Sequence, residues 1–125
     1  MLVLGIDPGT AICGYGLVEQ NGSRLLPHAY GAITTSSKMP VEKRLLKIYT
    51  ALDELIQKYH PEAMGVEQLF FNRNVTTAIP VGQARGVVLL AAAQNNLVLI
   101  ERTPLQVKQS VTGYGRQQRN RSSTW

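Results

Sequence analysis

The stretch LVLGIDPG, residues 2–9, decides how this chain is interpreted. Its apolar residues predict a buried β-strand, and Asp7 carries a carboxylate to the end of that strand, directly before a Pro-Gly turn. Such a carboxylate is costly to bury unless something compensates its charge, and a divalent cation is a natural partner. The alternative is that Asp7 only caps the turn that follows it. The rest of the sequence has to decide between these two roles.

Length and composition predict one cytoplasmic domain. The chain has 125 residues, of which 44% are apolar, enough for a real hydrophobic core. No apolar run reaches the roughly 18 residues of a membrane span, and the first apolar run lacks the basic flank of a signal peptide. The single cysteine, Cys13, excludes an internal disulfide, fits a reducing compartment and is interpreted as a core residue. With only two separated histidines, His28 and His60, we do not expect a zinc site.

The net charge of +5 is unevenly distributed. All eight acidic residues lie at or before Glu101, and only basic charges follow it. An acid-free basic end favours a polyanionic partner such as nucleic acid, although a solvated tail is the alternative. A nucleotide-binding domain of the actin type, which the first loop also fits, would not need this asymmetry.

The order of predicted elements is strand, strand, strand, helix, strand, helix, strand. Periodicity and turn signals predict a mixed α/β sheet, with its first three strands antiparallel and joined through a hairpin at Asn21-Gly22. The expected elements are strands at 2–7, 13–20, 24–34, 63–67 and 97–100, and helices at about 41–60 and 75–94. No internal repeat is visible.

Two carboxylates end strands in this scheme, Asp7 after the first and Glu67 after the fourth. If those strands are neighbours, their ends lie about 4.8 Å apart and both side chains can reach one cation. Hard oxygen ligands of this kind suit Mg²⁺ or Mn²⁺. The alternative for Glu67 is a solvent-facing strand end. Because the two residues occur as a pair, we favour a metal site.

Four motifs then resemble one family, that of the RuvC crossover-junction endodeoxyribonucleases. The motifs are residues 4–10 with 14–16 (LGIDPGT, GYG), 66–70 (VEQLF), 82–86 (GQARG) and 106–109 with 113–115 (QVKQ, GYG). They follow the family order and cover residues 1 to about 116. The resemblance implies a ribonuclease-H-like fold, a homodimer, and magnesium-dependent nicking of four-way DNA (Holliday) junctions. It also makes branch-migration proteins possible partners.

The resemblance also assigns site residues. Asp7 and Glu67 match metal ligands, and Lys108 matches a lysine near the active site that could neutralise the scissile phosphate. Phe70 matches an aromatic residue near the scissile position, and its neighbour Arg73 lies in a polar loop suited to DNA. Aromatic side chains can wedge between or stack on bases of an opened junction. Phe71 is as readily interpreted as a core residue, and Arg85 is a weaker candidate for pairing or phosphate contact.

The resemblance ends near residue 116. In the family, helices carrying two further acidic ligands follow, whereas residues 117–125 contain no acid and no apolar periodicity. We therefore interpret 1–116 as an incomplete nuclease domain lacking the family's C-terminal helices, and 117–125 as a disordered tail. A two-metal nuclease needs about three or four carboxylates. We expect weak metal binding and little cleavage, with Glu101, placed after the last strand, as the first substitute ligand to test.

The second helix carries Ala78, Gly82 and Gly86 at four-residue spacing. Glycine costs about 1 kcal/mol relative to alanine within a helix, so a packing reason is expected. This smooth face can pack on the chain's own sheet or across a two-fold axis on a second subunit. Three functions remain open: a junction-nicking endonuclease, a non-catalytic junction-binding fragment, and an actin-like nucleotide-binding domain that rests on the first loop alone.

Overall fold

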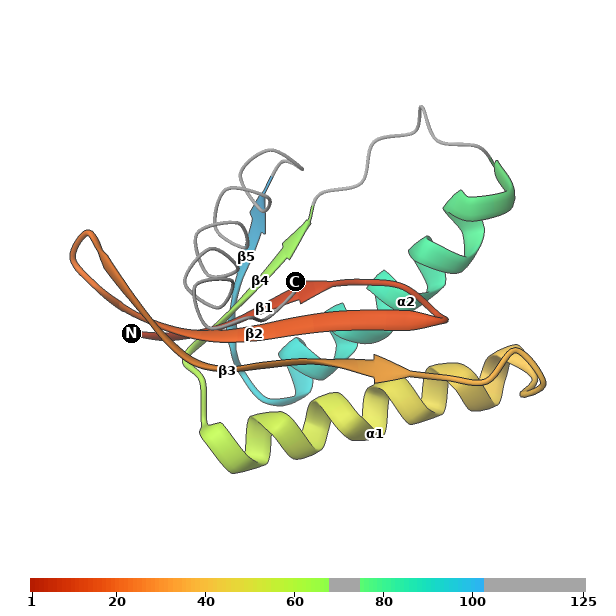
Figure 1. The fold of residues 1–125 in the computed structure, drawn as a ribbon, viewed down its shortest axis with the longest axis horizontal. Helices are drawn as coiled ribbons and strands as arrows, with labels where there is room; N and C mark the ends of the chain where they lie inside the picture. Colours follow the sequence, from red (N-terminus) through yellow and green to blue (C-terminus); the bar gives the residue numbers. More distant parts are fainter. Residues whose placement is uncertain (68–74, 103–125) are drawn as a thin grey trace, which may run out of the picture.

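The structure is a computed structural model that describes residues 1–67 and 75–102. This part of the chain forms a five-stranded sheet with two helices (Figure 1). In chain order the elements are β1 (Leu2–Asp7), β2 (Ile12–Asn21), β3 (Arg24–Thr34), α1 (Val41–Tyr59), β4 (Ala63–Glu67), α2 (Val75–Gln94) and β5 (Val98–Arg102). The predicted mixed α/β architecture is confirmed.

The strands lie in the order β3-β2-β1-β4-β5. β1 pairs antiparallel with β2 and parallel with β4, and β5 adds to β4 in parallel. The chain reaches β4 from β3 through α1, which is the long crossover that parallel pairing requires. β1 is therefore the central strand, and its carboxyl end lies at the same edge of the sheet as that of β4.

The first three strands form the expected antiparallel meander, but the hairpin turn lies one residue later than predicted. Asn21 pairs with Arg24, so the two-residue loop is Gly22-Ser23. Gly22 has φ 62°, a left-handed conformation that glycine adopts without steric cost. A register shift further along β3 falls next to Pro27, a residue that an edge strand accommodates because its missing N–H is not needed there.

The boundary of β5 is also corrected. The strand was expected at 97–100 but runs from Val98 to Arg102. After α2, Asn96 takes a left-handed φ of 56° and the Leu97 amide donates to the Ala92 carbonyl, so the helix termination includes Leu97. Glu101 therefore lies within β5 rather than after it.

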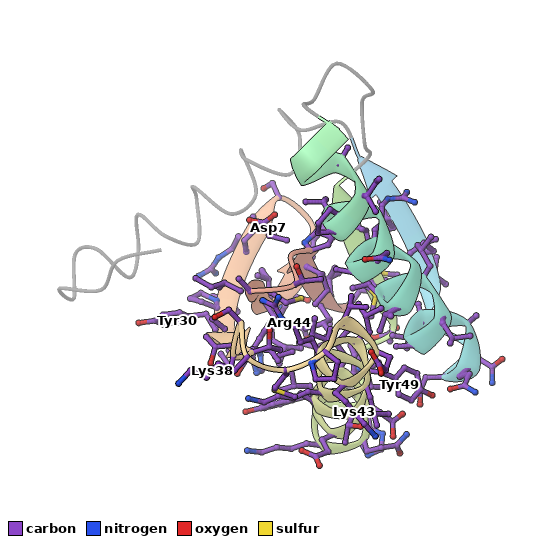
Figure 2. The ribbon with its side chains drawn as sticks, turned by 90° about the vertical axis from the view of Figure 1, so that its right-hand side faces the viewer. Asp7, Tyr30, Lys38, Lys43, Arg44 and Tyr49 are labelled. Atoms are coloured by element: carbon purple, nitrogen blue, oxygen red, sulfur yellow. The ribbon has the colours of Figure 1, made fainter. Side chains whose placement is uncertain are left out.

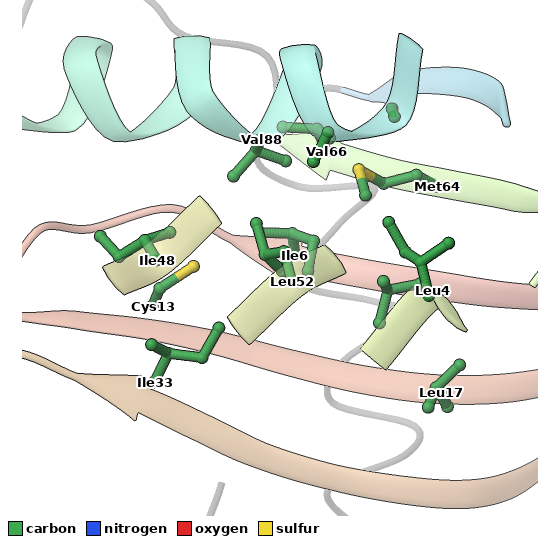
Figure 3. Close-up of a cluster of buried hydrophobic side chains, with 13 residues drawn as sticks. Leu4, Ile6, Cys13, Leu17, Ile33, Ile48, Leu52, Met64, Val66 and Val88 are labelled. Carbon is green, nitrogen blue, oxygen red and sulfur yellow. The ribbon is translucent and has the colours of Figure 1, made fainter. Parts of the chain in front are cut away.

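Both helices cover one face of the sheet. Buried side chains of α1 and α2 meet those of β1, β2 and β4 in a single cluster (Figure 3). The cluster is formed by Leu4, Ile6, Cys13, Leu17, Ile33, Ile48, Leu52, Ile56, Met64, Val66, Val88, Ala91 and Ala92. Helical spacing on α1 brings Ile48, Leu52 and Ile56 to the sheet. Among the described residues, neither helix is long and apolar enough to cross a membrane.

Candidate metal and nucleic-acid site

Asp7 is the last residue of β1 and its side chain is exposed. Alternation along the strand places it on the sheet face opposite the buried Ile6. Its partner on β2 is Gly14, and a Cβ added to Gly14 would lie 3.8 Å from the Cβ of Asp7. The missing side chain of Gly14 therefore leaves space directly beside the carboxylate.

Glu67 is the last residue of β4, the strand parallel to β1. The register pairs Ile6 with Val66, so Asp7 and Glu67 are the next positions along two neighbouring strands. The backbones of parallel neighbours lie about 4.8 Å apart, and the two strands end at the same edge (Figure 1). We call this place the metal edge; the side chain of Glu67 lies outside the described residues.

The turn that follows Asp7 is fastened to the connection between β3 and α1. The Thr35 amide donates to the Ala11 carbonyl over 3.0 Å, and the Thr35 hydroxyl donates to the Thr10 carbonyl. Arg44, from the start of α1, donates through Nε to Thr35 Oγ1 over 2.8 Å. Nearby, Lys47 Nζ donates to the Thr34 carbonyl over 2.6 Å. The first turns of α1 are thereby tied to the turn that follows Asp7.

Cys13 lies beneath this turn and is completely buried. Burial raises the pKa of its thiol to about 11, because a thiolate loses its hydration there. A hydrogen bond from the Gly9 backbone lowers the pKa in part, and the negative charge of Asp7 raises it further. The thiol is therefore neutral at physiological pH, which agrees with its interpretation as a core residue rather than a nucleophile.

Of the other predicted residues, only Arg85 and the backbone of Glu101 fall within the described part of the chain. Phe70, Arg73 and Lys108, together with Phe71, lie outside the described residues. Glu101 pairs with Val66, whereas Arg102 pairs with Glu67, so Glu101 is one register position away from the metal edge. Arg85 is half-buried on α2.

Sequence reasoning missed the roles of Gly14, Thr35 and Arg44. A glycine within a strand pattern is a signal for a close approach or an open site, and it could have identified Gly14. The hydrogen bonds of Thr35 and Arg44 join segments with no periodic relation, so no local pattern could have identified them.

Comparisons with known proteins identify the family and the fold. The model of the family described as crossover junction endodeoxyribonuclease RuvC matches residues 3–124. The crossover junction endodeoxyribonuclease RuvC of Desulfitobacterium hafniense is 60% identical over 116 residues, which are 93% of this chain and 70% of that protein. The corresponding protein of Heliobacterium modesticaldum is 59% identical over 116 residues, covering 93% of this chain and 72% of that one.

A solved structure of Thermus thermophilus RuvC in complex with a Holliday junction substrate has the same fold. It superposes with a TM-score of 0.80 at 35% sequence identity, covering 90% of this chain and 69% of that chain. The ribonuclease-H-like sheet, the four motifs and these relatives all lead to one assignment. The chain belongs to the RuvC family of crossover junction endodeoxyribonucleases.

Proposed function

We propose that this chain is a metal-dependent Holliday-junction endonuclease whose metal edge is formed by Asp7 and Glu67. The observation that carries the proposal is the parallel register of β1 and β4, which pairs Ile6 with Val66 and so aligns the next two residues, both acidic. The family of the chain and the junction DNA held by its Thermus relative support the choice of substrate.

Asp7 and Glu67 are the residues that would hold Mg²⁺, or Mn²⁺ in its place. The donor set fits, because carboxylate oxygens are the ligands these hard cations prefer. Gly14 has no side chain beside Asp7, so none crowds the carboxylate from that position. Such an ion, when bound, supplies Lewis-acid activation of the phosphodiester and of the attacking water.

The chain's own residues have the tasks of positioning and of binding DNA. Among the described residues, Thr35 and Arg44 hold the turn after Asp7, so the carboxylate is presented on a supported turn. We assign Phe70 and Arg73 to the opened junction and Lys108 to the scissile phosphate, on the strength of the sequence motifs.

A homodimer is part of the proposal, with α2 as the contact surface. A Cβ added at Gly82 or Gly86 would meet no described atom within 4 Å, so this face does not pack against the described part of its own sheet. On the same helix, Ile79 is 59% exposed and Leu90 is 53% exposed. An apolar helix face beside small residues favours a symmetric partner, which suits cleavage on two strands.

The cleavage step is tested with a synthetic four-way junction and Mg²⁺, using Asp7→Asn and Glu67→Gln against the control Glu54→Gln. Glu54 is an exposed carboxylate on α1, so its replacement removes the same charge away from the metal edge. We expect either edge variant to lower the nicking rate by at least about 10²-fold, because an electrostatic contact to the reacting group is lost. Equal nicking by all three variants would contradict the metal edge.

Two carboxylates leave excess positive charge when two divalent cations bind, so we expect the second ion to bind weakly without DNA phosphate. The 125-residue polypeptide should therefore bind junctions better than it cuts them. Junction affinity is measured in Ca²⁺ and the nicking rate in Mg²⁺, on the same substrate. A junction bound and cut as fast as by the Thermus relative would contradict this expectation.

A further inference from the structure

The end of the molecule that carries Asp7 also carries most of the basic charge near α1. Residues 34–47 contain four cations, Lys38, Lys43, Arg44 and Lys47, and one acid, Glu42. We call these four cations the β3–α1 basic surface. Figure 2 looks at this end of the molecule, with Asp7 above, Arg44 in the middle and Lys38 and Lys43 below. Asp7 and the basic surface therefore lie at the same end of the molecule.

Two of the four cations are anchored and two extend into solvent. Arg44 and Lys47 donate to Thr35 and to the Thr34 carbonyl, which fixes the surface beside the turn after Asp7. Lys38 and Lys43 are exposed, and neither forms an ion pair with a carboxylate among the described residues. The anchored pair sets the position and the exposed pair offers uncompensated charge.

The first two turns of α1 carry more positive than negative charge. Cations are unfavourable near a helix N-terminus because they face the positive end of the helix dipole. Glu42 in the first turn and Lys58 in the last turn have the favourable placement, but Lys43 also lies in the first turn. The N-cap, Pro40, makes no side-chain capping hydrogen bond. Helix stability does not explain the excess of Lys43, Arg44 and Lys47 over the single acid, and a bound polyanion would compensate it.

We propose that the β3–α1 basic surface binds the sugar-phosphate backbone of a DNA arm that runs past the metal edge. This inference rests on the proposed function and adds a contact outside the motifs that identify the family. Lysine side chains suit this task, because they neutralise phosphates without reading bases. We favour a DNA duplex over an acidic protein because the surface is connected to the turn after Asp7, where the proposed function places the scissile phosphate. The connection is Thr35, which forms hydrogen bonds with both Thr10 and Arg44.

The test compares two double variants that remove the same charge. Lys38→Gln with Lys43→Gln removes the exposed pair of the basic surface. Arg24→Gln with Lys58→Gln is the control, because Arg24 flanks the β2–β3 hairpin and Lys58 lies in the last turn of α1, both at the opposite end of the molecule. Circular dichroism and thermal unfolding test whether each variant is folded. The affinity of each variant for a four-way junction and for a linear duplex is then measured over a series of salt concentrations.

We expect the Lys38/Lys43 variant to bind the junction roughly tenfold more weakly at moderate salt. The slope of log affinity against log salt should become shallower by about 2, because each lost phosphate contact contributes about 0.9 to that slope. The Arg24/Lys58 control should keep the slope. Equal losses in both double variants would overturn the inference, since only net charge would then matter, and so would an unchanged slope in the Lys38/Lys43 variant. If the unmodified chain shows no preference for the junction over the duplex, the proposed function fails and the inference fails with it.

Discussion

The buried thiol of Cys13 predicts a loss of stability at high pH. The thiol has an ordinary pKa of 9.0, which is raised to about 11 in the fold, chiefly because burial removes the hydration of the thiolate. Below pH 9 the thiol is neutral in both states and its full stabilising effect is present. Between pH 9 and about 11 the unfolded chain ionises first, so the free energy of unfolding falls as the pH rises.

The size of this loss follows from the shift. Each pKa unit corresponds to about 1.4 kcal/mol, so a shift from 9.0 to about 11 corresponds to about 3 kcal/mol between the two ends of the window. The full conversion applies because the Cys13 side chain is 0% exposed. Tyrosine and lysine residues also titrate at high pH, so the loss is measured as a difference between the chain and its Cys13→Ala variant.

The assay is urea unfolding of both proteins at a series of pH values. We expect their difference in unfolding free energy to be constant below pH 9 and to shrink by about 3 kcal/mol as the pH passes 11. The difference in ultraviolet absorbance between the chain and its Cys13→Ala variant gives the thiol pKa without the tyrosine contribution. Asp7→Asn should lower this pKa because a nearby negative charge is removed. Parallel curves for the two proteins over the whole range would refute the reasoning.

Three further predictions concern the core and the turn. Leu52→Ala should lower the free energy of unfolding by about 2–5 kcal/mol, because removing the completely buried side chain leaves a cavity. Urea denaturation measures this loss, and a loss below about 1 kcal/mol would mean that the helices are loosely packed on the sheet. Gly9→Ala places a Cβ 2.4 Å from the backbone oxygen of Ile12, so it should cost about 1–3 kcal/mol in thermal unfolding, and an unchanged midpoint would contradict this turn. Thr35→Val removes the hydrogen-bond partner of Arg44 Nε and should lower the free energy of unfolding by about 1–3 kcal/mol. Backbone amides of the turn after Asp7 should then exchange faster with solvent. Unchanged exchange would show that this hydrogen bond does not hold the turn.

The architecture could be predicted from local patterns. The apolar run of β1, the helical spacing of α1 and the hairpin glycine each identify their element without knowledge of the rest of the chain. The errors fell at boundaries, where tertiary hydrogen bonds decide: Asn21 joined the ladder by pairing with Arg24, and Leu97 stayed with the end of α2. Short-range periodicity contains no information about such contacts.

The candidate site could be predicted as a pair of acidic residues, on the condition that their strands are neighbours. Asp7 and Glu67 each looked like a strand end, and their relation needed the neighbour order of β1 and β4, which the topology supplies and the sequence does not state. The hydrogen bonds that hold the turn after Asp7 could not be predicted for a different reason. Thr35 and Arg44 are ordinary loop and helix residues, and their importance arises from what they touch.

The pairing of β1 with β4 has a consequence for the order in which the molecule acquires its parts. β1 forms its antiparallel partner β2 within a few residues, but its parallel partner begins at Ala63, about 60 positions away, with the whole of α1 between them. Contacts of such long sequence separation form late during folding, because the entropy of closing the loop is lost before the pairing contributes any stabilisation. A chain emerging from the ribosome therefore carries Asp7 on a finished hairpin long before Glu67 arrives beside it. The two residues proposed for the metal edge meet only after β1, β2 and β3 have formed, so a partly folded molecule lacks the assembled pair.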